Sequence, residues 1–238
     1  MLGTHDLWAL LLASFLLWIT PGHDNRVTRR RASFVLGVLV LWCALGAAAA
    51  TGEPDRVIVA FGDSLTAGQG VAPDESYPAL LAAKLRTEAY PYRVVNAGVS
   101  GDTTAGGLRR VDWALRSKPD IVLLELGVND AFRGQDLDRV RANLDAMVAR
   151  FEAGGARVLL LGMRLPPNYG GGYAGRFEKM YVEVAERRKV ALMPFFLDGV
   201  GAVARLNQPD GIHPTAEGYR VIVERLWPYL EPMLRRSR

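Results

Sequence analysis

A serine, an aspartate and a histidine occur in a chain order that could support nucleophilic catalysis. Ser64 lies in the segment 62–65 (Gly-Asp-Ser-Leu), and Asp210 stands three residues before His213. A serine hydroxyl is a poor nucleophile at neutral pH unless an imidazole accepts its proton and a carboxylate orients that imidazole. One turn of chain could present Asp210 to Nδ1 of His213 while Nε2 faces Ser64. Taken singly, Ser64 is also a typical helix N-cap and Asp210 a typical turn residue.

A second set of groups could stabilise an oxyanion. The tetrahedral intermediate of acyl transfer needs hydrogen-bond donors aimed at its oxygen, each worth about 3 kcal/mol. The backbone N–H groups of Ser64 and Gly98 and the side-chain amide of Asn129 could converge for this purpose. Each has a simpler interpretation, since glycine suits a tight turn and asparagine is a common turn side chain. It is the joint pattern that favours a catalytic site.

The scarcity of histidine and cysteine narrows the chemistry. Two of the three histidines, His5 and His23, precede the predicted domain. His213 is therefore the imidazole available there as a general base, and we expect no zinc site built from several histidines. The only cysteine, Cys43, also precedes the domain, which excludes a cysteine nucleophile and an internal disulfide within it. We expect neither a metal nor an organic cofactor.

The elements that must position these groups alternate along the chain from residue 56. Apolar runs of strand length alternate with segments of helical period, which is typical of βα units on a parallel sheet. We expect an α/β fold, a three-layer α/β/α sandwich with a flavodoxin-like, five-stranded parallel sheet. The predicted strands are 57–61, 93–97, 121–126, 157–162 and 191–194, and the predicted helices are 77–88, 105–116, 137–153, 176–188 and 216–234.

Polar motifs follow these strands where a ligand crevice is expected. In open parallel sheets the crevice lies beyond the carboxyl ends of the strands. Segment 62–65 follows the first predicted strand and Gly98 follows the second. Segment 127–130 (Gly-Val-Asn-Asp) follows the third, and 210–214 (Asp-Gly-Ile-His-Pro) comes well after the last. This order predicts that the candidate side chains meet at one edge of the sheet.

These blocks resemble, in the same order, the four motifs of the SGNH (GDSL) hydrolase superfamily. The likeness spans nearly all of residues 56–232 and is strongest toward the bacterial periplasmic enzymes called thioesterase I, arylesterase or lysophospholipase. The segments that carry it are Ser-Gly-Asp-Thr at 100–103, Leu-Gly-Val-Asn-Asp at 126–130, Arg-Leu-Pro-Pro-Asn-Tyr at 164–169 and Met-Pro-Phe-Phe at 193–196. They are more specific than the serine motif alone.

The resemblance implies the SGNH hydrolase fold and a serine esterase. Ser64 would be the nucleophile, His213 the general base and acid, and Asp210 the partner that orients His213. The oxyanion donors would be Ser64, Gly98 and Asn129. The implied substrates are carboxylic esters and thioesters such as aryl esters, lysophospholipids and acyl thioesters, cleaved through an acyl-Ser64 intermediate without a cofactor.

Candidate substrate contacts surround the motifs. They are Asp63, Leu65, Val128, Phe132 and Leu165. The apolar members could line an acyl groove or belong to the core. Val128 stands where the similar enzymes often have glycine, and a stiffer loop there could alter the groove. The motifs therefore leave the preferred acyl-chain length open.

The first fifty residues are typical of an export leader. Three arginines at 29–31 precede an apolar run at 34–46 and small residues at 47–51, which are the three regions of a signal peptide. We expect cleavage near Ala50, a catalytic domain over 51–238 and a periplasmic location, whereas an uncleaved leader would anchor the enzyme in the membrane. A second apolar run at 7–19 has two explanations, an alternative translation start at Val27 or a helical hairpin.

The charge balance argues against a nucleic-acid partner. Residues 51–238 carry 25 basic and 23 acidic side chains, which is too even for a surface that binds phosphate backbones. We expect a monomer that acts on a small-molecule acyl ester or thioester. A membrane lipid is among the substrates that the sequence allows.

Two other functions stay open at this point. The same three residues could remove acetyl groups from carbohydrates. Alternatively, the loop at 63–70 could hold a flavin phosphate in a flavodoxin-like binding module. That loop lacks the Gly-Lys-Ser/Thr ending of a P-loop, and a binding module would leave Asp210 and His213 unexplained.

Overall fold

The computed structural model describes residues 56–235, which form one parallel sheet with helices on both faces. The strands are β1 (Arg56–Gly62), β2 (Tyr92–Gly98), β3 (Ile121–Glu125), β4 (Arg157–Leu161) and β5 (Ala191–Met193). Their order is β2-β1-β3-β4-β5, and all neighbouring pairs are parallel. This is the order of flavodoxin-like folds. The predicted α/β fold with five parallel strands is confirmed.

The burial of each strand follows its place in the sheet. The central strands β1, β3 and β4 are buried over nearly their whole length, as a sheet covered on both faces requires. The edge strands β2 and β5 expose part of their residues. At the end of β1, Gly62 lies opposite both Gly98 of β2 and Glu125 of β3. The carboxyl ends of three strands therefore meet in register.

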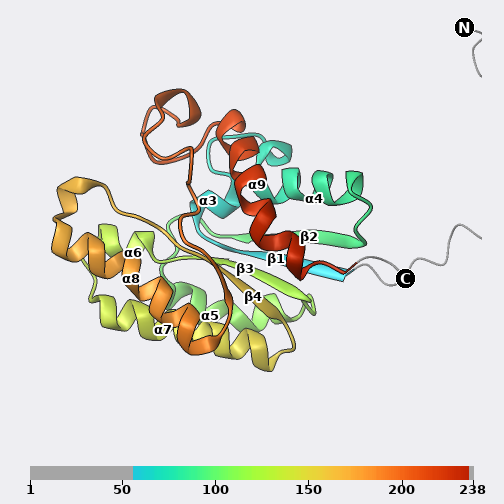
Figure 1. Cartoon of the computed structure of the whole chain (residues 1–238), viewed down its shortest axis with the longest axis horizontal. Coiled ribbons are helices and arrows are strands. Elements are labelled where there is room, and N and C mark those ends of the chain that lie inside the picture. Colours follow the sequence, from blue (N-terminus) through green and yellow to red (C-terminus); the bar gives the residue numbers. More distant parts are fainter. Residues whose placement is uncertain (1–55, 236–238) are drawn as a thin grey trace, which may run out of the picture. The chain divides into compact units, whose positions relative to one another are not determined.

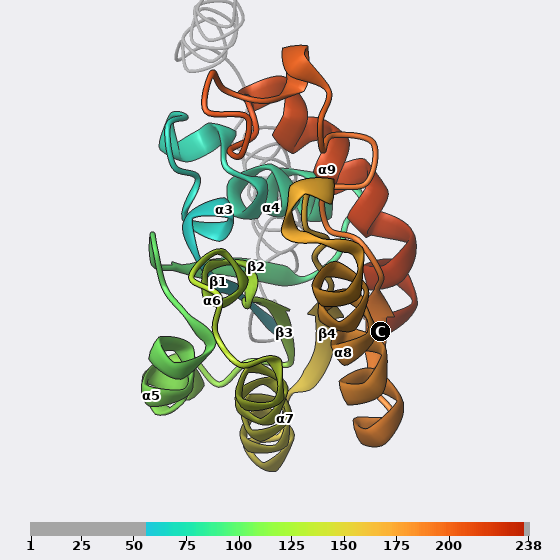
Figure 2. The ribbon, with the colours of Figure 1, turned by 90° about the vertical axis from the view of Figure 1, so that its left-hand side faces the viewer.

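The helices form the two outer layers (Figure 1 and Figure 2). Helices α4 (Tyr77–Thr87) and α9 (Ala216–Leu230) pack together on one face, and α5 (Thr104–Leu115), α7 (Leu137–Ala153) and α8 (Gly171–Arg188) cover the other. An edge-to-face ring pair lies on each side of the sheet. The ring centroids of Phe61 and Phe151 are 5.2 Å apart, and those of Tyr77 and Phe196 are 5.1 Å apart.

The structure differs from the predicted elements mainly in its short segments. The helices α3 (Ser64–Ala67) and α6 (Val128–Phe132) were not predicted, because four or five residues are too few to show a helical period. Helix α8 begins at Gly171 rather than 176, since glycines carry no apolar signal. Helix α9 ends at Leu230 rather than 234. The remaining elements are the 3-10 turns η1 (Pro73–Glu75), η2 (Pro167–Tyr169), η3 (Ala204–Leu206) and η4 (Glu231–Met233).

The predicted leader lies outside the described residues. This holds for segment 1–50, for the cleavage site near Ala50 and for the alternative start at Val27. Within residues 56–235, no helix has both the length and the apolar character needed to cross a bilayer.

Arg110 of α5 connects the ends of β1 and β2. Its Nη2 donates to the carbonyl oxygen of Gly62 at 2.8 Å, and Nη1 donates to that of Ala97 at 2.7 Å. Its Nε donates to Oδ2 of Asp102 at 2.7 Å, and the guanidinium carbon lies 3.8 Å from the centroid of the Phe61 ring. The side chains of Arg110 and Asp102 are only 17% and 11% exposed. If Arg110 is removed, little water can therefore reach the groups that it contacted.

Replacing Arg110 with methionine should lower the free energy of unfolding by about 3–5 kcal/mol, because it leaves a largely buried carboxylate without its partner. Arg109→Met is the matched control, since Arg109 is the exposed neighbour on the same helix, and its effect should stay within about 0.5 kcal/mol. Urea unfolding followed by circular dichroism measures both. Similar losses in the two variants would show that Arg110 does not connect the strand ends.

Candidate active site

The candidate residues lie at the carboxyl edge of the sheet, where the strand order changes direction between β1 and its two neighbours. Such switch points are where open α/β sheets bind ligands. Helix α3 follows β1 and α6 follows β3, and both lie at the same end of the sheet in Figure 1. The segment that precedes α9 joins them through the contacts of His213 given below. The site is thus assembled from three separate parts of the chain.

Ser64, His213 and Asp210 form a continuous hydrogen-bonded chain. Oγ of Ser64 lies 2.8 Å from Nε2 of His213, and Nδ1 of His213 lies 2.7 Å from Oδ2 of Asp210. A carboxylate accepts the Nδ1 proton, so Nε2 is left as the acceptor for the serine hydroxyl. Ser64 and His213 are each only 9% exposed. The predicted spacing of Asp210 and His213 therefore places the three groups in one hydrogen-bonded chain.

Asp210 is fixed by backbone as well as by the imidazole. Its Oδ1 accepts hydrogen bonds from the backbone N–H groups of Ile212 at 2.9 Å and His213 at 3.0 Å. These bonds, together with the one from the His213 ring, lower the pKa of Asp210 to about 2. The carboxyl is therefore ionised at neutral pH, which is the form that holds the imidazole in the required tautomer.

The loop that carries His213 is tied to the loop that follows α3. The backbone N–H of Gln208 donates to the carbonyl oxygen of His213 at 2.7 Å, and Asn207 pairs with Pro214 in a single antiparallel bridge. The side chain of Gln208 donates to the carbonyl oxygen of Gln69 at 2.7 Å. Because Gln69 comes directly after α3 and its C-cap, this bond fixes the histidine loop relative to the serine helix.

Asp63 connects the serine turn to Asn129. It caps α3, since its Oδ1 accepts the N–H of Leu65 at 3.0 Å, and its Oδ2 accepts Nδ2 of Asn129 at 2.9 Å. The side chain is fully buried, and burial raises the pKa of Asp63 to about 6. One carboxylate therefore sets the relative positions of Ser64 and the candidate oxyanion amide.

Asp130 fixes the other side of Asn129. Both of its oxygens are used by Thr104, the first residue of α5: Oδ1 accepts the Thr104 hydroxyl at 2.7 Å and Oδ2 accepts its backbone N–H at 2.8 Å. Asn143 of α7 in turn donates to the Thr104 hydroxyl at 3.0 Å. Asp130 is nearly fully buried. The short helix α6 is thereby attached to the large helices of one outer layer.

The predicted oxyanion donors are not all placed alike. The N–H of Ser64 is at the start of α3, where helical N–H groups have no intrahelical acceptor. One side-chain amide hydrogen of Asn129 donates to Asp63, and the other makes no hydrogen bond to the described residues. The N–H of Gly98, by contrast, donates to Oδ1 of Asn96 at 2.9 Å, so the structure does not present it to an oxyanion. A Cβ on Gly98 would lie 2.2 Å from the backbone nitrogen of Ala67, which explains glycine here by close packing.

Gly101, which the sequence analysis did not select, lies in the turn after β2. It has a φ of +76°, a conformation that favours glycine. In the part of the chain that the structure describes, its N–H donates to no other residue. Its carbonyl oxygen accepts Nη2 of Arg133, which directly follows α6, at 3.0 Å. The signal that could have identified it is the Ser-Gly-Asp segment at 100–102.

The predicted substrate contacts are mostly buried. Asp63 and Leu65 do not reach the surface, and Val128 and Leu165 are only 6% and 8% exposed. The first two side chains are therefore unavailable to a substrate in this structure, because they hold α3 in place. Phe132 is partly exposed.

The apolar surface near the site combines the predicted Phe132 with Val99 and Ile212, which were not predicted. The ring of Phe132 lies 5.6 Å from that of Tyr169 between centroids. Val99 in the turn before Gly101 is 47% exposed, and Ile212 beside His213 is 42% exposed. Exposed apolar side chains therefore flank the Ser64 region on more than one segment.

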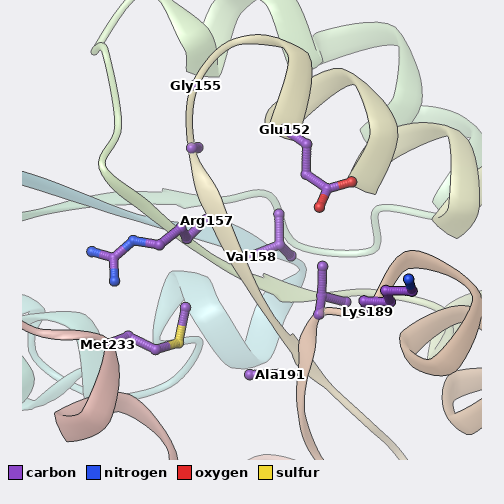
Figure 3. Close-up of a pocket in the computed structure, with 9 residues that line it drawn as sticks. Glu152, Gly155, Arg157, Val158, Lys189, Ala191 and Met233 are labelled. Carbon is purple, nitrogen blue, oxygen red and sulfur yellow. The ribbon is translucent and has the colours of Figure 1, made fainter.

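Two cavities lie elsewhere on the surface. One of about 400 Å³ is formed at the amino ends of β4 and β5, at the edge opposite Ser64, and Figure 3 shows its lining, which includes Arg157, Lys189 and Met233. The other, of about 450 Å³, is lined by residues between Ala202 and Gly211. The first is lined by none of Ser64, Asp210 and His213, and the second borders the loop that carries Asp210.

Comparison with known proteins gives consistent matches. Residues 60–221 match the model of the GDSL-like lipase/acylhydrolase family. The chain is 44% identical over 205 residues to esterase TesA of Pseudomonas aeruginosa, covering 86% of this chain and all of that protein. It is 35% identical over 211 residues to thioesterase 1/protease 1/lysophospholipase L1 of Escherichia coli K12, covering 88% of this chain and 96% of that protein.

The fold agrees with a solved structure. A crystal structure of TesA superposes with a TM-score of 0.73 at 46% identity, covering 75% of this chain and all of that one. The resemblance inferred from the motifs is therefore confirmed. The chain belongs to the GDSL-like lipase/acylhydrolase family and is a serine esterase of the SGNH type.

Proposed function

We propose that Ser64 is the nucleophile of this esterase, and the hydrogen-bonded chain from Ser64 through His213 to Asp210 is the observation that carries the proposal. As Oγ of Ser64 attacks the acyl carbonyl, its proton passes to Nε2 of His213. The imidazolium then protonates the departing alcohol or thiol, and an acyl-serine ester is left. Water attacks that ester with His213 again accepting the proton, and the acid leaves as the serine hydroxyl is restored.

The oxyanion of each tetrahedral intermediate needs donors on the side away from His213. We propose the N–H of Ser64, the second amide hydrogen of Asn129 and the N–H of Gly101. The bond from Asn129 to Asp63 at 2.9 Å supports the second, and the unengaged N–H of Gly101 beside α6 supports the third. Gly98, first selected from the motif, is replaced in this role because its N–H is bound to Asn96.

The substrates we propose are acyl esters and thioesters with an apolar acyl chain. The relatives are named for ester, thioester and lysophospholipid hydrolysis, and both ester classes use the same nucleophile and oxyanion site. The exposed apolar side chains of Val99 and Ile212, with Phe132 at the rim, suit an acyl chain or a single-chain lipid. The site lies within one chain, so we propose that a monomer is active.

Ser64→Ala should lower kcat/KM for p-nitrophenyl esters by at least about 10³-fold, because it removes the nucleophile and leaves only the binding groups. The assay uses purified enzyme and esters from acetyl to palmitoyl. Ser117→Ala is the matched control, since Ser117 follows α5 at the opposite edge of the sheet, and its activity should equal that of the wild type. Activity in Ser64→Ala near the wild-type level would exclude the serine mechanism.

The chain-length profile of the same assay distinguishes the substrate classes. Hydrolysis that rises with acyl length supports a lipid or fatty-acyl substrate. Hydrolysis confined to the acetyl ester, together with release of acetate from acetylated sugars, would instead identify a carbohydrate acetylesterase.

We also propose that residues 1–50 direct export and are removed near Ala50, which leaves a catalytic domain over 51–238 in the periplasm. Support comes from the arginine, apolar and small-residue regions of that segment. Mass spectrometry of the N-terminus after expression in a Gram-negative host should find a mature chain that starts close to Thr51. A precursor containing residues 1–26 would contradict initiation at Val27, and an intact leader on the mature enzyme would indicate membrane anchoring.

A further inference from the structure

Glu125 is a buried acid that the proposed mechanism does not use. It ends β3 beside Gly62 and is fully buried. Its Oε2 accepts the hydroxyl of Thr66 at 2.9 Å and the backbone N–H of Asp63 at 3.3 Å. A Cβ on Gly62 would lie 2.6 Å from Oε2 and 2.1 Å from the Thr66 hydroxyl. The first glycine of the serine motif is therefore the residue that makes room for this acid.

One carboxyl oxygen of Glu125 accepts no hydrogen bond from residues 56–235. Its Oε1 is buried and has no hydrogen-bond donor. An ionised carboxylate with a bare buried oxygen is costly, because nothing replaces the water that solvated its charge. A protonated carboxyl group has no such cost if its O–H finds an acceptor. The geometry therefore favours the acid form, with its O–H donated to a neighbouring acceptor.

The groups around Glu125 add negative charge or neutral hydroxyls. Asp63 adjoins it on the serine turn, while Tyr77 of α4, Tyr181 of α8 and Tyr219 of α9 approach from three helices. Burial and the charge of Asp63 raise the pKa of Glu125 well above its usual value, although the bonds from Thr66 and the Asp63 N–H oppose this. Asp63 is also affected by His213, whose positive charge would lower the pKa of Asp63.

We propose that Glu125 is a protonated carboxylic acid at neutral pH and that its Oε1–H donates to the carboxylate of Asp63. The pair then holds one proton and one negative charge. Asp63 keeps its ionised form and accepts Leu65 N–H, Asn129 Nδ2 and the Glu125 proton. Glu125 is thus a positioning residue, because it acts on the reaction only through Asp63 and Asn129. The inference rests on the proposed role of Asn129 as an oxyanion donor.

Infrared spectroscopy tests the protonation state directly and without substrate. The wild type at neutral pH should show the carbonyl stretch of a protonated carboxylic acid, and Glu125→Gln should lack it. Glu88→Gln is the control, since Glu88 is an exposed residue at the end of α4, and it should keep both the band and full activity. The absence of the band in the wild type, or its persistence in Glu125→Gln, would overturn the proposal.

Kinetics test the positioning role. Glu125→Gln keeps an acceptor for Thr66 and a donor for Asp63, so its kcat should stay within about threefold of the wild type. Glu125→Ala loses both and should lower kcat about 10- to 100-fold with KM changed less than about twofold, because an oxyanion donor acts mainly in the transition state. If the glutamine variant loses as much kcat as the alanine variant, the neutral acid is not what positions Asp63.

The pH dependence of the melting temperature tests the protonation state without Glu125→Ala, so it applies even if that variant does not fold. The folded wild type retains a proton that the unfolded chain releases, so its stability falls as pH rises through that interval. The melting temperature of Glu125→Gln minus that of the wild type should therefore increase as the pH rises from about 5 to about 8. A constant difference would contradict the proposal.

Asn129→Ala separates this inference from the proposed function. That variant should lower kcat by about 10²- to 10³-fold, as loss of an oxyanion donor does. If it leaves kcat unchanged while the infrared band behaves as expected, the oxyanion assignment fails and the acid pair stands. If kcat falls but no protonated carboxyl is found, the acid pair fails and the oxyanion assignment stands.

Discussion

The carboxylate of Asp63 is the contact on which the site depends. It caps the four-residue helix of the nucleophile and accepts the amide of Asn129. A helix this short has almost no stability of its own, since nucleation costs more than so few bonds return. Its position must therefore come from tertiary contacts. The side chain of Tyr219, which donates to the carbonyl oxygen of Leu65 at 3.0 Å, is another such contact.

The parallel sheet supplies the frame for these contacts. Its three central strands are buried on both faces, so their register is strongly specified and their carboxyl ends cannot shift relative to one another. Arg110 then connects the ends of β1 and β2, while Glu125 at the end of β3 accepts the hydroxyl of Thr66 on the serine helix. Most of the polar groups buried at this edge have hydrogen-bond partners, and these partners come from different strands and helices.

Much of the fold followed from local patterns in the sequence. Long apolar strands and amphipathic helices have clear periods, and the five strands and five long helices were predicted in the right order. The short helices α3 and α6 were not, because they exist through Asp63, Asp130 and Tyr219 rather than through their own periodicity. The predicted start of α8 was wrong because its first turn contains glycines, which carry no apolar signal. The predicted end of α9 was wrong because a 3-10 turn replaces the helix there.

The sequence identified some residues of the candidate site and missed others. The segments that contain Ser64, Asp210 and His213 could be found because histidine is scarce in the chain and because each segment carries a specific motif. Gly98 and Gly101 are both glycines after the same strand, and only the backbone shows that the N–H of one is bound to Asn96. Likewise, nothing local in the sequence reveals that Leu65 is buried or that Glu125 lies against Asp63, since both depend on packing between strands.

The bond between Ser64 and His213 joins residues 149 positions apart. Closing so long a loop is costly in chain entropy, and contacts of this range slow folding. Helix α9 begins three residues after His213, and its Tyr219 donates to the carbonyl oxygen of Leu65, so the packing of α9 holds the two segments together. A chain without its last helix therefore lacks one of the contacts that hold the segment of His213 against the segment of Ser64. The contact between Ser64 and His213 therefore exists only when the first strand and the last helix of the domain have come together.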